Sequence, residues 1–173
     1  DEEEKKKIFE VLESYIMRRL VCNSKTGNYS DLFSENLIGN QILTASALKQ
    51  YLQGKEPTSS LAIPSNTELE EGFTYNKLTN KRARGILYML ESRIRSCAFM
   101  ATELLPFERY TLEHILPQKW TLDKWPLPED VTMEQRNSKL QTLGNFTILP
   151  QPLNTSISNE SWANKLNGNN KNR

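Results

Sequence analysis

The spacing of apolar residues predicts that the first part of the chain is helical. Between positions 8 and 20 they recur at intervals of three and four: Ile8, Val11, Leu12, Tyr15, Ile16 and Leu20. This is the spacing of one helix face, so we expect a helix over about 3–22. Similar patterns predict helices over about 30–52, 65–72 and 80–98, the first of these three breaking near Gly39. Ser65 followed by Glu68 indicates a capped helix start, and Gly72 indicates that helix's end.

After position 105 the pattern changes from helical spacing to alternation. Two sets of residues alternate here: Leu112, His114 and Leu116 in one, Thr111, Glu113 and Ile115 in the other. This alternation predicts a strand over 109–116, and a similar segment predicts a second strand over 145–149. We expect the two strands to pair antiparallel. A Trp- and Pro-rich loop over 118–131 and a short helix over 133–140 would separate them, and a helical region would follow.

These elements place the chain in the α+β class, mostly α. We expect a helical subdomain over 1–105, a small two-stranded ββα module over 106–167 and a frayed, Asn-rich tail over 168–173. The apolar runs are far shorter than the roughly 20 residues that a membrane helix needs, so no membrane segment is expected. Cys22 and Cys97 form no CxxC pair, which excludes a cysteine zinc site. We expect reduced thiols in a cytoplasmic protein.

Charge divides the chain although its net value is only +1. Residues 1–73 hold 8 Lys and Arg against 12 Asp and Glu, whereas residues 74–173 hold 14 against 9. Basic residues concentrated in one part are typical of a surface that binds DNA phosphates, although a merely solvated helix face has the same composition. The candidate DNA-binding residues are Lys81, Arg82, Arg84, Arg93, Arg95, Lys119 and Lys165.

His114 is the one histidine of the chain, so a general base near neutral pH is either this residue or a carboxylate with a perturbed pKa. The simpler interpretation is a histidine that only satisfies a hydrogen bond. Its neighbour Glu113, with Asn145 and Asn154 further along, favours phosphodiester hydrolysis. Carboxylate and amide oxygens suit Mg²⁺, and an asparagine between them can fix a loop. In a regular strand Glu113 and His114 point to opposite faces, so a shared site requires the strand to end or bulge there.

The segment Glu113-His114-Ile115-Leu116-Pro117-Gln118 and the later LGNFTIL and Leu153-Asn154 resemble the HNH (His-Me finger, ββα-metal) nuclease motif. The version is that of the C-terminal domain of GmrSD-type modification-dependent restriction enzymes and related antiphage proteins. Further positions match the same pattern: Arg18, Arg19, Cys22, Pro64, Ser65, the helix from Lys81 to Arg95, Ser158, Asn159, Trp162 and Lys165. The resemblance therefore covers nearly the whole chain.

This resemblance implies a Mg²⁺-dependent DNA endonuclease that nicks or cuts both strands, with Mn²⁺ as a substitute ion. His114 would be the base, Asn145 the structural asparagine, and Glu113 with Asn154 the metal ligands, Asn159 being the alternative to Asn154. The resemblance also implies sequence-nonspecific DNA binding and an N-terminal partner domain that hydrolyses nucleotide and senses modified DNA. The alternatives are an HNH scaffold that only binds DNA or protein, and a helical interaction domain whose histidine is structural.

Overall fold

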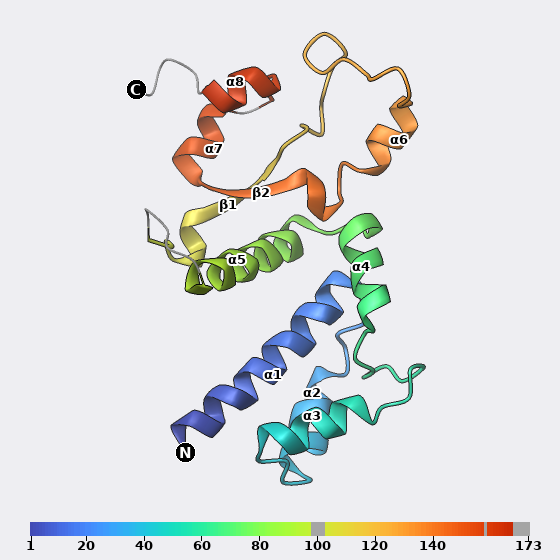
Figure 1. Cartoon of the computed structure of the whole chain (residues 1–173), viewed down its shortest axis with the longest axis vertical. Helices are drawn as coiled ribbons and strands as arrows, with labels where there is room; N and C mark the ends of the chain where they lie inside the picture. Colours follow the sequence, from blue (N-terminus) through green and yellow to red (C-terminus); the bar gives the residue numbers. More distant parts are fainter. Residues whose placement is uncertain (98–102, 158, 168–173) are drawn as a thin grey trace. The chain divides into compact units, whose positions relative to one another are not determined.

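The computed structural model describes residues 1–97, 103–157 and 159–167 (Figure 1). The chain forms two compact units, Asp1–Phe73 and Thr74–Arg173. This division falls where the charge changes sign, since the first unit carries a net −4 and the second a net +5. The boundary predicted between positions 105 and 106 lies within the second unit and stays a prediction. The predicted frayed tail over 168–173 lies outside the described residues.

All regular elements of the first unit are helices. Its elements are α1 (Glu2–Val21), α2 (Tyr29–Asp31), the π-helix η1 (Leu32–Ile38), α3 (Ala45–Gln53) and most of α4 (Asn66–Tyr75). The side chain of Asp1 caps α1 by accepting the N–H of Glu4 at 2.7 Å. The predicted helix over 30–52 is interrupted after η1, and α3 begins anew where Thr44 accepts the N–H of Ala47.

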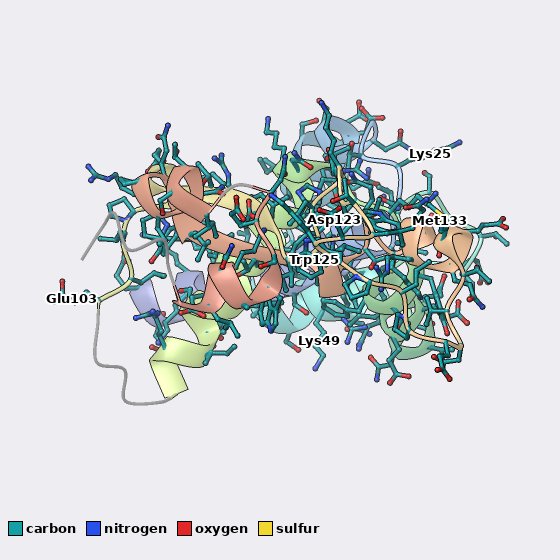
Figure 2. All side chains as sticks on the ribbon, turned by 90° about the horizontal axis from the view of Figure 1, so that it is seen from above. Lys25, Lys49, Glu103, Asp123, Trp125 and Met133 are labelled. Carbon is teal, nitrogen blue, oxygen red and sulfur yellow. The ribbon has the colours of Figure 1, made fainter. Side chains whose placement is uncertain are left out.

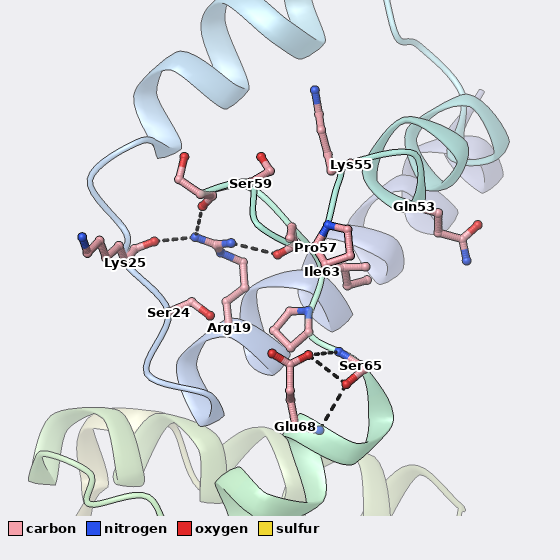
Figure 3. A pocket seen from close by; sticks show the side chains of 13 residues that line it. Arg19, Ser24, Lys25, Gln53, Lys55, Pro57, Ser59, Ile63, Ser65 and Glu68 are labelled. Atoms are coloured by element: carbon pink, nitrogen blue, oxygen red, sulfur yellow. Dashed lines mark hydrogen bonds between the residues drawn. The ribbon is translucent and has the colours of Figure 1, made fainter.

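A buried arginine connects α1 to the segment that leads into α4. Arg19 is 2% exposed, and its guanidinium donates to the carbonyl oxygens of Lys25, Ser60 and Ala62, the last two at 2.8 and 2.9 Å (Figure 3). The guanidinium also lies over the aromatic rings of Tyr15 and Tyr29. A cavity of about 390 Å³ lies beside this arginine. Because the guanidinium donates to three backbone oxygens and to the Tyr29 hydroxyl, Arg19 links several segments of the first unit.

Helix α4 starts as predicted but continues past its predicted end. Glu68 accepts the N–H of Ser65 at 2.8 Å while its own N–H donates to the Ser65 hydroxyl, which confirms the capping box (Figure 3). The prediction that Gly72 ends the helix is wrong. A Cβ at this position would lie 2.9 Å from both Cγ1 and the carbonyl oxygen of Val21, so the glycine permits close packing on the end of α1.

The second unit contains the predicted strand pair and confirms the α+β, mostly α class. Its elements are α5 (Asn80–Cys97), the 3₁₀ turn η2 (Phe107–Arg109), β1 (Tyr110–His114), α6 (Met133–Ser138), the 3₁₀ turn η3 (Leu143–Asn145), β2 (Phe146–Pro150), α7 (Gln151–Ile157) and α8 (Trp162–Asn167). Strands β1 and β2 pair antiparallel, with Tyr110 opposite Pro150 and His114 opposite Phe146.

Helices cover both faces of this small sheet. Figure 1 shows α5 on one side of the strands and α7 with α8 on the other. The ring of Tyr110 contacts Tyr88 of α5, whereas Thr111 accepts a hydrogen bond from Asn154 of α7. The alternation along β1 therefore assigns successive residues to opposite helices. Across the described ranges, no helix is long and apolar enough to cross a membrane.

The loop over 118–131 is irregular, as predicted, but well tied to its surroundings. The guanidinium of Arg136 donates to the carbonyl oxygens of Trp125 and Pro126 at 2.6 and 2.8 Å. The indole of Trp120 donates to Asn137 at 2.9 Å. Trp125 is labelled in Figure 2. These hydrogen bonds between the loop and α6 give a long connection a defined course beside the end of β1.

Candidate active site

Glu113 and His114 occupy the last two positions of β1. The pairing with β2 stays regular to the end, because Glu113 lies opposite Thr147 and His114 opposite Phe146. The imidazole of His114 packs edge-on against the ring of Phe146, with 4.8 Å between the ring centroids. The strand thus ends at His114 without a bulge. Because both residues take part in this regular pairing, their side chains leave the strand on opposite faces, and a site that they share can form only around the end of the strand.

The imidazole of His114 is half-buried and touches one polar side chain of the following loop. The Nε2 atom of His114 lies 3.1 Å from Nε2 of Gln118. Burial lowers the pKa of His114 below its ordinary value of 6.5, and Lys165 adds to this effect while Glu113 opposes it. The ring is therefore neutral over a wider pH range than an exposed histidine, which is the form that accepts a proton.

Asn145 clamps the backbone that follows His114. Its Oδ1 accepts the N–H of Leu116 at 2.8 Å, and its Nδ2 donates to the carbonyl oxygens of Leu116 and Leu140, both at 3.0 Å. Its own carbonyl oxygen accepts the N–H of Ile115 at 2.8 Å. Three of these hydrogen bonds thus fix the turn after β1 at Ile115 and Leu116, and the fourth ties Asn145 to Leu140 in the segment before η3.

Asn154 joins α7 to β1 on the face where Glu113 points. Its Nδ2 donates to Thr111 Oγ1 at 2.8 Å and to the carbonyl oxygen of Leu112 at 3.1 Å. Since a carbonyl oxygen only accepts, the amide orientation is set, and Oδ1 is the atom directed away from these partners. Asn159, the alternative ligand, lies beyond the end of α7 and is exposed.

Lys165 of α8 contacts both Glu113, the predicted metal ligand, and His114, the predicted base. Its ammonium donates to the carboxylate of Glu113 and to the carbonyl oxygen of His114, the latter at 2.8 Å. The Lys165 side chain is 4% exposed and that of Glu113 is 15% exposed. The sequence predicts Lys165 as a DNA-binding residue, but its buried ammonium faces Glu113 instead.

The other predicted DNA-binding residues divide into packed and exposed groups. Arg84 lies over the ring of Phe107 and donates to the carbonyl oxygen of Tyr110 at 3.3 Å, so it supports the sheet. Arg95 forms an ion pair with Glu91 at 2.6 Å. Arg82 is half-buried. The exposed members are Lys81, Arg93 and Lys119. The basic character of α5 is therefore partly a packing feature.

Two interactions of the site do not follow from the sequence pattern. Gln118 belongs to the HNH-like segment without a predicted role, although a position four residues after His114 and directly after Pro117 could have suggested a turn back to the imidazole. Lys165 lies in the predicted module and is predicted to bind DNA, whereas its partner in the structure is Glu113. Its pairing with Glu113 spans 52 positions, and no local pattern indicates an interaction of that kind.

Comparison with known proteins identifies the family. The sequence profile described as GmrSD restriction endonucleases, C-terminal domain, matches residues 63–173. No curated protein and no solved structure matches the chain. The matched range contains both strands, the Asn145 clamp and the helices α7 and α8. The profile covers well over half of the sequence, and the chain therefore belongs to the family of C-terminal domains of GmrSD restriction endonucleases.

Proposed function

We propose that this domain hydrolyses DNA phosphodiester bonds with the help of a bound Mg²⁺ ion, and that His114 is the general base. The observation that carries the proposal is the Asn145 clamp at the end of β1. Its hydrogen bonds fix the turn directly after the only histidine of the chain, and a carboxylate immediately precedes that histidine. Membership in a family of restriction endonuclease domains supports DNA as the substrate.

The proposed reaction is an attack of water on phosphorus. As the water oxygen bonds to phosphorus, the bond to the 3′-oxygen breaks, and the water must lose a proton. Gln118 contacts Nε2 of His114. The Gln118 amide N–H donates to this nitrogen, so in the neutral imidazole Nδ1 carries the hydrogen and Nε2 is the basic atom. We assign the water's proton to Nε2. Phe146 and the clamped turn hold the ring in place.

The residues present fit a Mg²⁺ ion that keeps most of its waters. Among the described residues, no group of three His, Cys, Asp or Glu side chains can hold a metal. The donors are instead the Glu113 carboxylate and the Oδ1 atom of Asn154, both oxygens, which Mg²⁺ and Mn²⁺ accept. When bound, the ion supplies stabilisation of the negative charge that develops on the phosphate and the leaving oxygen.

The biological role that we propose is DNA cutting in a bacterial restriction or antiphage system. Phosphate contacts do not read sequence, so target choice would lie elsewhere. We propose that a nucleotide-hydrolysing domain that senses DNA modification, in the same polypeptide or complex, directs this domain to its target.

Supercoiled plasmid tests the proposed function directly. Incubation with the protein and Mg²⁺ should convert the plasmid to nicked or linear DNA whose breaks carry 5′-phosphate and 3′-hydroxyl ends. A protein that retards the plasmid in a gel without breaking any strand would instead be a binding module, and the proposed function would be wrong.

The cleavage rate should depend on pH through His114. The neutral imidazole is the active form, and burial lowers the pKa of His114 below 6.5. We therefore expect a rate that falls as the pH decreases, with a midpoint below pH 6.5. The measurement is the rate of plasmid nicking at saturating Mg²⁺ across a pH series, with circular dichroism to show that the fold persists. An acid limb with a midpoint above pH 6.5 would contradict this assignment.

DNA affinity should depend on exposed lysines of the second unit. Replacing Lys81 and Lys119 with Gln should reduce the slope of log K against log salt by about 0.9 for each phosphate that is no longer neutralised. The matched control replaces Lys6 and Lys49, exposed lysines of the acidic first unit, and should leave the slope unchanged. Fluorescence anisotropy with a labelled duplex in Ca²⁺ gives both slopes. Equal slopes for the two double variants would place the DNA elsewhere.

A further inference from the structure

The proposed metal site contains a built-in cation. The ammonium of Lys165 donates to the Glu113 carboxylate and to the His114 carbonyl oxygen, and its side chain is 4% exposed. Water screens charges weakly at such a position. Lys165 thus places a fixed positive charge against the one carboxylate that we propose as a metal ligand.

This arrangement leaves the proposed site without net negative charge. The charge of Glu113 is balanced by Lys165, while Asn154 and the neutral imidazole of His114 contribute none. A divalent cation that approaches Glu113 adds two positive charges beside an existing one, and like charges in a shielded environment repel strongly. What the site lacks is an anion, and the phosphate of DNA is one.

We propose that Lys165 makes divalent-cation binding at Glu113 depend on DNA, so that the cation and the scissile phosphate enter the site together. The inference rests on the proposed function, since it takes Glu113 and Asn154 as the ligands. Because coupling between two ligands is reciprocal, the cation strengthens DNA binding by the same factor. Lys165 acts here as a positioning residue that sets the charge of the site, in addition to tying α8 to β1.

Mn²⁺ binding, read by electron paramagnetic resonance, tests the proposal without reliance on activity. The full chain carrying His114→Ala, which prevents cutting, is titrated with Mn²⁺ alone and with a short DNA duplex. The same titrations with Glu113→Gln added measure Mn²⁺ held by DNA or by other groups, and are subtracted. We expect the Glu113-dependent Mn²⁺ affinity to rise by about 5- to 150-fold when DNA is present, the usual range of coupling between sites. Equal affinity with and without DNA would overturn the proposal, and this comparison needs no change at Lys165.

Substitution of Lys165 then tests whether this residue causes the coupling between Mn²⁺ binding and DNA binding. Lys165→Met should tighten Mn²⁺ binding in the absence of DNA and reduce the gain that DNA brings, whereas Lys165→Arg keeps the charge and should behave like Lys165. Unchanged or weaker Mn²⁺ binding in a folded Lys165→Met variant would overturn the role of Lys165. Plasmid cutting by the unaltered protein reports the proposed function separately. Metal-dependent cutting without coupling would refute only this inference, and absence of any Glu113-dependent Mn²⁺ site would refute both.

Discussion

Replacing His114 with Ala should lower the rate of DNA cleavage by at least about 10²–10⁴-fold, the usual contribution of a general base. The chain has no second histidine that could take over the proton. The fold should survive, because the imidazole is half-buried and its ring contact is with Phe146 at the end of the strand. Plasmid nicking under single-turnover conditions measures the reduction in rate.

The control for this variant is a test of whether it still folds. Circular dichroism and thermal unfolding of His114→Ala should match those of the unaltered protein, so that the lower rate reflects chemistry. Gln118→Ala is a useful companion, since it removes the polar contact to Nε2 while keeping the base, and it should cost less activity. An unfolded His114→Ala protein would mean that the histidine is structural, and a fully active one would exclude it as the base.

Replacing Asn145 with Ala should damage stability and activity together. The substitution removes three side-chain hydrogen bonds and leaves backbone groups of Leu116 and Leu140 without their partner. Unpaired groups of this kind cost roughly 1–3 kcal/mol of unfolding free energy. The turn after β1 would also lose its fixed course, so the cleavage rate should fall. Urea unfolding and plasmid nicking measure the two effects.

Asn145→Asp separates the parts of this clamp. The aspartate keeps an oxygen that accepts the N–H of Leu116 but loses the N–H groups that donate to Leu116 and Leu140. We therefore expect this variant, too, to lose cleavage activity and stability. Asn137→Ala, which removes the acceptor of the Trp120 indole but none of the hydrogen bonds of the Asn145 clamp, serves as the matched control and should leave the cleavage rate nearly unchanged. Full stability of Asn145→Ala would show that the clamp is not needed for the fold of the turn.

The strand pair could be predicted from sequence because its signals are local. The alternation over 109–116 and the segment at 145–149 each have the period of a strand, and the antiparallel pairing of β1 with β2 confirms the two strands. The predicted bounds differ from the structure, because β1 already ends at His114 and β2 continues to Pro150. The capping box at Ser65 and Glu68 is likewise a pattern within four residues. Such features depend on neighbours in the chain, so the sequence contains what is needed to find them.

Contacts between distant segments could not be predicted in the same way. Gly72 has the appearance of a helix end, yet it lies inside α4, where a side chain would collide with Val21. The sequence predicts that Arg84 and Lys165 both bind DNA, whereas the structure shows Arg84 donating to the carbonyl oxygen of Tyr110 and Lys165 donating to the Glu113 carboxylate. The identity of a lysine or arginine in the sequence does not reveal whether its partner is a phosphate or a carboxylate. Only the fold decides which partner lies within reach.

The dependence of strand cutting on a divalent cation and on Glu113 tests the central claim most directly. Supercoiled plasmid is incubated with the protein in EDTA, and excess Mg²⁺ is then added to the same sample, in parallel with the Glu113→Gln variant. The account predicts no breaks in EDTA, rapid conversion to nicked or linear DNA after Mg²⁺ is added, and little recovery in the variant. Cutting that continues in EDTA, or that the folded Glu113→Gln variant performs at the full rate, would contradict it.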